Sequence, residues 1–554
     1  MFASKGNFYE KLQFFRISLA KLVNICYNEK INIEREDDFM QTKEWIMLGT
    51  ILVYMAMMLC IGFLVSRKNK TAGDFYLGGR SLGPLVTAMS AEASDMSGWL
   101  LMGLPAVAMM GGLAEASWTA IGLAIGTYIN WLIVAKRLRV YTHKVDAFTL
   151  PDFFTRRFGD KHRILTIVAA VMIVIFFIPY TASGFAACGK LFSALFGMDY
   201  MLAMVLSAAV IVLYCTLGGF LAASTTDFVQ SIVMTIALLV VVGFGEGMVN
   251  GFENVFANVG QLDGFLNLFE GHNVATATKG SYGALPVVST LAWGLGYFGM
   301  PHILLRFMAI EDENKLKTSR RVASVWVVIS MGVAVLIGVV GYSLMKQGIL
   351  PAYADASAAE TIIVDIAKYL GDFGWVPAMT AGIILAGILA STMSTADSQL
   401  LAAASSISQN LIVESFGVKL SQKKNMILAR VAVIAISIIA IFLAADPSSS
   451  VFRIVSFAWA GFGAAFGPVV LCALFWKRTN KYGAIAGMLA GGVTVFVWKF
   501  VIRTVFAGTW LDIYELLPAF VLALVVIVVV SLLTPAPEKE LTDTYDEVKL
   551  SCKK

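Results

Sequence analysis

Long apolar stretches, separated by short polar segments, follow one another along most of the chain from about residue 47. A helix needs about 20 apolar residues to cross the hydrocarbon core of a bilayer. By that measure the sequence predicts thirteen membrane-spanning helices, at 47–66, 84–111, 115–135, 164–187, 198–216, 226–249, 285–307, 322–346, 375–407, 427–445, 451–475, 482–503 and 514–534. The pattern therefore predicts an all-α polytopic membrane protein.

The second stretch carries a carboxylate, Asp95, about eleven residues beyond its start at Pro84. At 1.5 Å per residue this places Asp95 roughly 16 to 17 Å deep, near the middle of a core about 30 Å thick. A charge there costs about 3 kcal/mol or more unless it is paired or faces a wet cavity. Because the neighbouring Ser97 and Gly98 are poor helix formers, we expect the helix to open here and free backbone carbonyls as ligands. The alternative is a hydrogen-bonded carboxylate that only holds a neighbouring helix.

The ninth stretch carries a stripe of hydroxyl groups. Its members follow the i, i+3, i+4, i+7 spacing of one helix face, and they are Ser391, Ser394, Thr395 and Ser398. Oxygen ligands suit a hard alkali cation, whereas a transition metal would call for His or Cys. We therefore interpret the stripe, facing the opened helix near Ala93 and Met96, as a sodium site. Small polar residues that only pack helices together are the alternative.

The seventh stretch contains three glycines and a proline within nine residues, and Trp293, Tyr297 and Pro301 recur every four residues. A broken helix lined by aromatic rings suits a small amphipathic solute, whose carboxylate a half-helix N-terminus can bind. Interfacial aromatics with glycine-mediated packing are the alternative. The two interrupted helices each begin a set of five, 84–249 and 285–475, which indicates inverted repeats around a midplane site.

The composition agrees with a membrane protein, with 58% hydrophobic and 14% charged residues. Most of the 42 Lys and Arg residues fall in loops on one side of the predicted bundle. Basic loops stay in the cytoplasm, so we expect the N-terminus outside and the C-terminus inside. The net charge of +5 then reflects topology, and it gives no reason to propose a nucleic-acid partner.

The six cysteines and four histidines are scattered along the chain. We expect no disulfide framework, no metal other than Na+ and no cofactor. An intramembrane enzyme should have clustered acid, base or metal groups, a sensor should carry a signalling domain, and an ATP-driven pump should contain a P-loop. The sequence favours none of these classes, and we expect no enzymatic activity.

Three segments are expected. Residues 1–40 form an N-terminal extension with mixed charges and no long apolar core, and Met40 is the expected initiator, with a surface helix or disordered segment as the alternative. Residues 41–534 form the membrane domain, with a core at about 84–475. Residues 535–554 form a polar cytoplasmic tail. The external loops 250–284 and 347–374 are long enough to fold over a solute entrance.

Several motifs resemble those of the sodium/solute symporters. They lie at 77–84, 94–105, 218–223, 293–299 and 458–468, and the resemblance extends from about Lys43 to Leu533. It implies a LeuT-like core of ten helices in a 5+5 inverted repeat, flanked by one N-terminal and two C-terminal helices.

The resemblance also implies roles for individual residues. The family's sodium site falls on the carbonyls of Ala93 and Met96 and on Ser391, Ser394 and Thr395, and Asp95 matches a carboxylate needed for sodium coupling. The solute pocket falls on Ser97, Gly98, Trp99, Tyr180, Trp293, Tyr297 and Pro301, and Arg80 matches a cytoplasmic-side arginine important for transport. Many relatives have alanine in place of Ser391, so its hydroxyl is a possible additional ligand here.

Two further carboxylates are candidates for an accessory role. Asp227 matches an aspartate that binds an extra sodium ion in some relatives, and Asp397 stands where those relatives have serine. The pair could bind a second cation or share a proton, because like charges at short range resist double ionisation. The alternative is that Asp227 and Asp397 cap helices or pair with cytoplasmic basic groups.

The function implied is Na+-coupled uptake of L-proline by alternating access. Another amino acid, a carboxylate or a sugar is the alternative solute. The expected partners are L-proline, Na+ and the lipid bilayer, without an obligate protein partner. The expected location is the plasma membrane of a bacterium.

Overall fold

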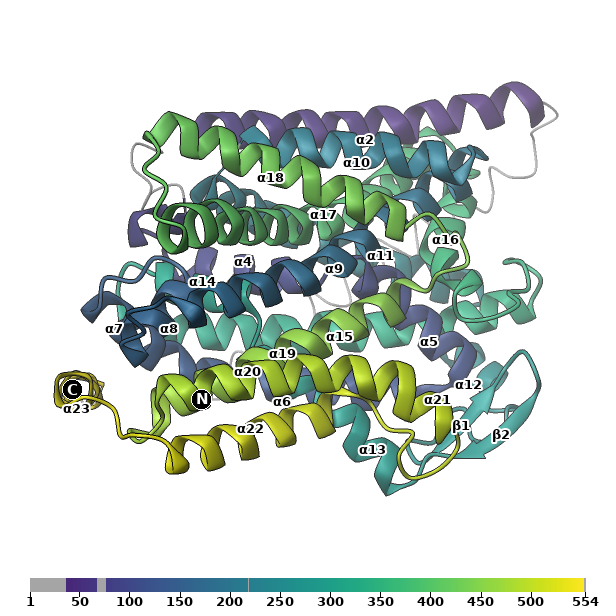
Figure 1. Cartoon of the computed structure of the whole chain (residues 1–554). Coiled ribbons are helices and arrows are strands. Elements are labelled where there is room, and N and C mark those ends of the chain that lie inside the picture. The colour runs from purple at the N-terminus through teal and green to yellow at the C-terminus, as the bar shows by residue number, and fades with distance from the viewer. Residues whose placement is uncertain (1–35, 67–75, 218, 553–554) are drawn as a thin grey trace, which may run out of the picture.

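The structure, a computed structural model, describes residues 36–66, 76–217 and 219–552, and most of this part of the chain is helical (Figure 1). Ten of the described helices are long and apolar enough to cross a membrane. The second, fifth and seventh predicted spans consist of shorter apolar helices. Each of the thirteen predicted spans thus corresponds to helical structure. The predicted N-terminal extension lies outside the described residues as far as residue 35.

The first half of the chain contains the first six spans and the helices that connect them. Its elements are α2 (Glu36–Ser66), η2 (Gly78–Arg80), α4 (Pro84–Asp95), η3 (Trp99–Gly103), α5 (Leu104–Gly111), α6 (Leu113–Ile129), η4 (Asn130–Val134), α7 (Ala135–Lys144), α8 (Leu150–Phe158), α9 (Ile164–Phe196), α10 (Tyr200–Leu217), α11 (Phe220–Met248) and α12 (Phe252–Val259). The basic loop expected at 136–163 is therefore largely helical, as α7 and α8.

The second half contains the remaining spans and one antiparallel hairpin, in which Glu270 pairs with Ser281 and Asn273 with Thr278. Its elements are β1 (Glu270–Asn273), β2 (Thr278–Ser281), α13 (Ala284–Leu291), η5 (Ala292–Phe298), α14 (Pro301–Ala309), η6 (Glu313–Lys315), α15 (Leu316–Lys346), η7 (Ala358–Thr361), α16 (Ile362–Gly371), α17 (Trp375–Ser405), η8 (Ser406–Ser415), α18 (Gln422–Leu443), α19 (Val451–Phe475), α20 (Lys481–Val497), η9 (Trp498–Ile502), α21 (Arg503–Val505), α22 (Leu516–Leu533) and α23 (Lys539–Ser551).

The long helices run side by side as a bundle, with α7, α8 and α23 at one end and α12, the hairpin and α16 at the other (Figure 1). The centre of the bundle includes α17, which packs against α2, α9 and α11. Its many Ala, Gly, Ser and Thr side chains are small, so neighbouring helices approach closely. This packing buries the hydroxyl stripe instead of exposing it to lipid.

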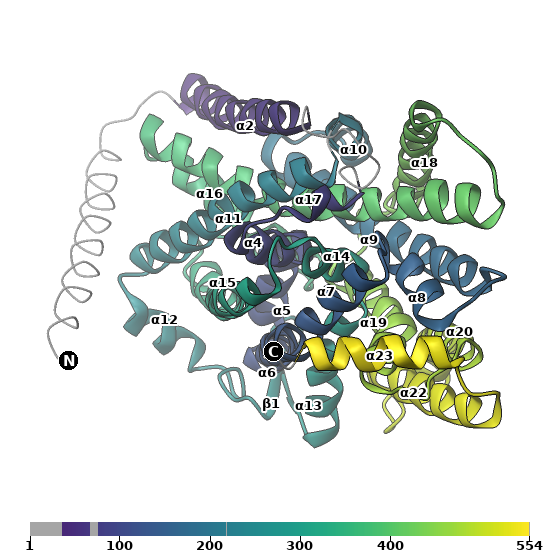
Figure 2. The same cartoon turned by 90° about the vertical axis from the view of Figure 1, so that its left-hand side faces the viewer.

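The C-terminal segment forms a helix that docks on the bundle. Figure 2 shows α23 lying across the end of the molecule near α7. Tyr545 and Val548 are buried there, and the Arg157 guanidinium lies 5.1 Å from the centre of the Tyr545 ring. Lys144 and Glu547 form an ion pair of 2.9 Å. The predicted polar tail therefore includes an amphipathic helix that covers this end.

The backbones of α6 and η5 touch through glycines. A Cβ atom on Gly126 would lie 2.3 Å from the carbonyl oxygen of Gly294, and one on Gly294 would lie 2.2 Å from that of Gly122. No side chain fits at such distances, so this crossing requires glycine on both elements. It brings the interrupted seventh span directly against α6.

Candidate functional site

The second span is broken where the sequence predicts it. The helix α4 ends at Asp95, and Met96 leaves the helical region with φ −84° and ψ 73°. Helical structure resumes at Trp99 in η3. The nearby glycine is sterically required, because a Cβ on Gly98 would lie 2.8 Å from Cβ of Ala187. The chain therefore presents a short non-helical segment in the interior of the bundle.

Asp95 lies at the centre of this break and is completely buried. Its Oδ2 accepts a hydrogen bond of 2.6 Å from the Tyr297 hydroxyl. Its main-chain carbonyl accepts hydrogen bonds from the Tyr180 hydroxyl, at 3.0 Å, and from the Trp99 indole, at 3.2 Å. Ser97 is buried beside Tyr180. Five predicted site residues thus converge from α4, the non-helical segment after it, η3, α9 and η5.

Four of the five residues predicted to bind sodium, Ala93, Ser391, Ser394 and Thr395, are linked by hydrogen bonds. The Ser394 hydroxyl donates to the Ala93 carbonyl at 2.7 Å, so the stripe on α17 contacts the last turn of α4. The Ser391 carbonyl accepts hydrogen bonds from Ser394 at 3.1 Å and from Thr395 at 3.0 Å. The Ser391 hydroxyl donates to the Ile388 carbonyl of its own helix. Carbonyl and hydroxyl oxygens of two helices therefore cluster beside the break.

The seventh span is interrupted as well. It consists of α13, the 3₁₀ segment η5 and α14, and Met300 between the last two has an extended backbone. Pro301 is the first residue of α14 and is buried. The glycines and the proline that predicted a weak helix therefore coincide with a real discontinuity.

An aromatic cluster surrounds Trp293. Its ring centre lies 6.0 Å from that of Trp99 and 5.3 Å from those of Phe452 and Tyr514, and it stacks on Tyr514. The Trp459 indole donates to the Trp293 carbonyl at 2.7 Å. Trp293 is only 4% exposed. The sequence reasoning missed Phe452, Trp459 and Tyr514, although Trp459 belongs to the motif at 458–468.

The buried carboxylate of Glu360, in η7, holds the aromatic cluster in place by binding the N-terminus of α19. Glu360 accepts hydrogen bonds from the backbone N–H groups of Val451 and Phe452, at 3.1 and 3.2 Å, and from the Ser450 hydroxyl at 2.8 Å. Lys190 of α9 forms a buried ion pair of 2.6 Å with the same carboxylate. Glu360 thus binds the N-terminus of α19, where a negative charge is favourable, and orients Phe452 over Trp293.

Arg80 lies apart from the aromatic cluster, at the end of the bundle where α7 and α14 finish. It donates hydrogen bonds to the carbonyls of Met308, Thr142 and Ala147, at 2.8, 3.1 and 2.7 Å. Partial burial lowers the pKa of Arg80 to about 10, so it remains positively charged at neutral pH. It joins three separate chain segments at one end.

The two accessory carboxylates belong to one buried network. Asp227 forms an ion pair of 3.0 Å with Arg306 and accepts from the Ser90 hydroxyl at 2.7 Å. Arg306 also donates to Ser398 at 2.5 Å, and Ser398 donates to Asp397 at 3.0 Å. The basic partner of Asp227 is thus within the seventh span, not in a cytoplasmic loop. The sequence did not lead us to Arg306, although a charged residue inside an apolar stretch could have identified it.

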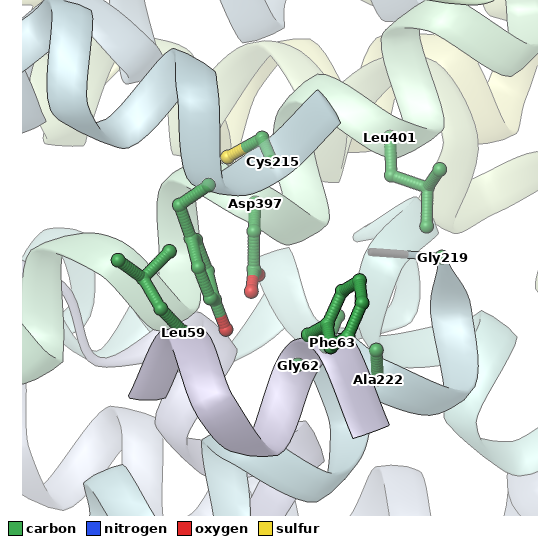
Figure 3. Close-up of a pocket in the computed structure, with 10 residues that line it drawn as sticks. Leu59, Gly62, Phe63, Cys215, Gly219, Ala222, Asp397 and Leu401 are labelled. Carbon is green, nitrogen blue, oxygen red and sulfur yellow. The ribbon is translucent and has the colours of Figure 1, made fainter. Parts of the chain in front are cut away.

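Asp397 also lines a small pocket between α2, α10, α11 and α17 (Figure 3). Figure 3 shows its carboxylate among Leu59 and Phe63 of α2 and Cys215 of α10. Among the described residues, its Oδ2 has no hydrogen-bond partner. Asp397 therefore faces a pocket whose lining includes none of the residues of the aromatic cluster.

A membrane-spanning bundle with two interrupted helices, and with a buried set of oxygen atoms where α4 meets α17, is typical of a secondary transporter. The sodium:solute symporter family model matches residues 75–491, and the chain belongs to this family. The protein is thus a multi-pass transporter of the plasma membrane.

Two curated relatives are similar over nearly their whole length. The sodium/proline symporter of Escherichia coli (strain K12) is 43% identical over 510 residues, covering 90% of this chain and 96% of the relative. The osmoregulated proline transporter OpuE of Bacillus subtilis (strain 168) is 42% identical over 490 residues, covering 88% and 94%.

The structure of a Na+-coupled sialic acid symporter in its substrate-bound outward-open state superposes with a TM-score of 0.71, at 17% identity, covering 89% of this chain and 99% of that one. The predicted fold is confirmed: ten core helices in two sets of five, preceded by α2 and followed by α20 and α22.

Proposed function

We propose that this protein couples the inward movement of Na+ to the uptake of L-proline by alternating access. The hydrogen bond between Ser394 and Ala93 carries the proposal, because it joins a hydroxyl stripe to a broken helix end in a family of sodium symporters. The choice of solute rests on relatives 42 to 43% identical that are named for proline transport.

The sodium ligands proposed are the carbonyls of Ala93 and Met96 and the oxygens of Ser391, Ser394 and Thr395. These are hard, uncharged donors that can replace the hydration shell of an alkali cation. Asp95 is proposed to assist coupling through its charge, since its carboxylate is held by Tyr297 and its carbonyl by Tyr180. Na+ is transported cargo, and we propose that the protein needs no cofactor.

The solute pocket proposed lies beside the two breaks. Aromatic rings of Trp99, Trp293 and Tyr297 provide apolar faces for a pyrrolidine ring. The freed backbone around Ser97 and Gly98 is suited to the solute carboxylate, because the helical segment formed by η3 and α5 begins here and its N-terminal end is partially positive. Tyr180 and Pro301 complete the proposed pocket.

We propose that Na+ binds first from outside and holds α4 against α17, which organises the pocket beside η5. Solute binding then favours closure outside and opening inside. The membrane potential contributes about 2.3 kcal/mol per elementary charge per 100 mV. The inward movement of Na+ can therefore drive uptake of the solute against its own concentration gradient. Arg80 is proposed to hold the cytoplasmic end closed until that step.

The proposed orientation places the N-terminus outside and α23 in the cytoplasm, because the basic loops then stay inside. This places the hairpin, α12 and α16 on the outer face (Figure 1). We propose no enzymatic activity, no nucleic-acid partner and no obligate protein partner.

The test is uptake of radiolabelled L-proline into proteoliposomes containing the purified protein. An inward Na+ gradient should drive accumulation that a K+ gradient does not, and only unlabelled proline should compete among amino acids and sugars. Sodium-driven uptake of another solute would support the proposed ion site and contradict the assignment of proline as the solute. If the protein takes up none of the solutes in the panel in a Na+-dependent manner, the proposal is contradicted.

A further inference from the structure

Tyr514 brings a side chain into the aromatic cluster from beyond the core helices. It lies in the loop between α21 and α22 and is 8% exposed. Its ring centre lies 5.3 Å from that of Trp293, with an angle of 21° between the two ring planes. Aromatic pairs prefer this kind of offset stacking, so Tyr514 covers one face of the Trp293 indole. The proposed transport mechanism gives Tyr514 no role.

Two hydrogen bonds fix Tyr514 to two core helices. Its backbone N–H donates to the Ser289 hydroxyl of α13 at 2.7 Å. Its own hydroxyl donates to the Ser456 carbonyl of α19, also at 2.7 Å. The helix α13 leads directly into η5, which carries Trp293. The ring is therefore held at its tip and at its main chain, and it has little freedom to move away from the indole.

The next residue, Glu515, anchors the loop. Its completely buried carboxylate pairs with Arg503 of α21 at 2.7 Å and with Lys499 of η9 at 3.5 Å. Arg503 also pairs with Asp512 of the same loop, at 3.1 Å. Salt screens pairs that include a buried group much less than exposed pairs. The two sides of the loop are thus held together around Tyr514.

The start of α22 supports the same place by close packing. Leu516 is completely buried. A Cβ atom on Gly463 of α19 would lie 2.7 Å from Cδ1 of Leu516 and 2.8 Å from Cα of Gly296 in η5. The chain around Tyr514 therefore rests directly on α19 where α19 meets η5.

We propose that Tyr514 is a positioning residue for solute recognition, whose anchored ring fixes the orientation of Trp293 and thereby limits the size of the solute that the pocket admits. The Trp293 indole can rotate about two side-chain bonds. Tyr514 occupies the space into which the indole would otherwise turn. The inference rests on the proposed function, because Trp293 is a residue of the proposed solute pocket.

The expected consequence is selection by ring size. One extra methylene changes binding to a close-fitting apolar pocket by about 10- to 200-fold. Piperidine-2-carboxylate, the six-membered-ring homologue of proline, should therefore be a poor ligand of the wild type. Without the Tyr514 ring the indole can withdraw from the solute, and the pocket should then admit the homologue.

Competition against uptake of radiolabelled L-proline into proteoliposomes measures this selection. In Tyr514→Ala, the ratio of the half-inhibitory concentrations of piperidine-2-carboxylate and proline should fall about tenfold. Tyr514→Phe keeps the ring and the main-chain hydrogen bond, and it should retain the wild-type ratio within about twofold. Tyr482→Phe, at an exposed position on α20, is the matched control. A loss of stability alone would lower uptake without changing the ratio, so an unchanged ratio in Tyr514→Ala would overturn the proposal.

Fluorine NMR of protein labelled with 5-fluorotryptophan tests the orientation of Trp293 without a transport assay. The Trp293 resonance is identified by its loss in Trp293→Phe. It should be single and narrow in the wild type, and split or broadened in Tyr514→Ala. A single narrow resonance in the folded variant would overturn the proposal.

Tyr514→Leu keeps much of the apolar volume without a flat ring, and it replaces Tyr514→Ala in both measurements if the alanine variant does not fold. The two proposals also fail separately. If the wild type moves no proline, the proposed function is contradicted, and the NMR comparison still decides whether Tyr514 positions Trp293.

Discussion

The hydroxyl of Ser394 lies 2.7 Å from the carbonyl oxygen of Ala93, although 301 positions separate the two residues along the chain. This contact joins the middle of α17 to the last turn of α4. A cation that binds here would be held by both halves of the inverted repeat. Its binding would therefore affect both the interrupted helix α4 and α17.

Replacing Ser394 by alanine should weaken Na+ binding. The variant loses one oxygen ligand and the hydrogen bond to Ala93, and we expect the Na+ concentration for half-maximal uptake to rise about tenfold, which corresponds to about 1.4 kcal/mol. Sodium titration of uptake at saturating solute measures this. Ser405→Ala is the control, because the Ser405 hydroxyl bonds only to Ala402 of the same helix, and an equal loss there would contradict the site.

Replacing Trp293 by phenylalanine should weaken solute binding more than sodium binding. The smaller ring contributes less apolar contact area, at about 25 cal/mol per Å², and loses its stacking on Tyr514. We expect the solute concentration for half-maximal uptake to rise about tenfold in solute titrations. Trp326→Phe, on α15, should behave as wild type, since the Trp326 indole bonds to Thr235. An unchanged solute affinity in Trp293→Phe would remove Trp293 from the pocket.

Replacing Lys190 by methionine should destabilise the protein. The change leaves the buried Glu360 carboxylate without its cation, and breaking a buried pair in this way costs about 3 to 5 kcal/mol. A lower temperature of unfolding in detergent should report this loss. Lys315→Met breaks the exposed pair with Glu311 and should cost at most about 1 kcal/mol. Similar unfolding temperatures for both variants would show that the Lys190 pair does not support α19.

Removing Asp397 should leave the ratio of Na+ to solute unchanged. The structure gives Asp227 a cation of its own, Arg306, whose guanidinium also bonds to Ser398 beside Asp397. We therefore expect Asp397→Ala to transport with the wild-type ratio, measured from paired fluxes of ²²Na+ and labelled solute. A lower ratio in the variant would mean that Asp397 binds a second sodium ion.

Local patterns predicted both helix breaks, since Gly, Pro and small polar residues inside apolar stretches weaken a helix wherever it lies. Helical spacing alone likewise placed Ser394 and Thr395 on one face. Partners from distant parts of the chain had no such signal. The engagement of Asp227 by Arg306 and the support of Phe452 by Glu360 depend on how separate helices pack. The resemblance to a family supplied several pocket residues that spacing alone did not.

The backbones of α6 and η5 meet at Gly126 and Gly294 with no side chains between them. This contact has no side chains between the two backbones that could repack, so we expect α6 and η5 to move together. Bending must then be absorbed where the backbone already departs from the helix, at Met96 and Met300. We therefore expect the glycine contact between α6 and η5, together with the two helix breaks, to determine which parts of the protein move during transport.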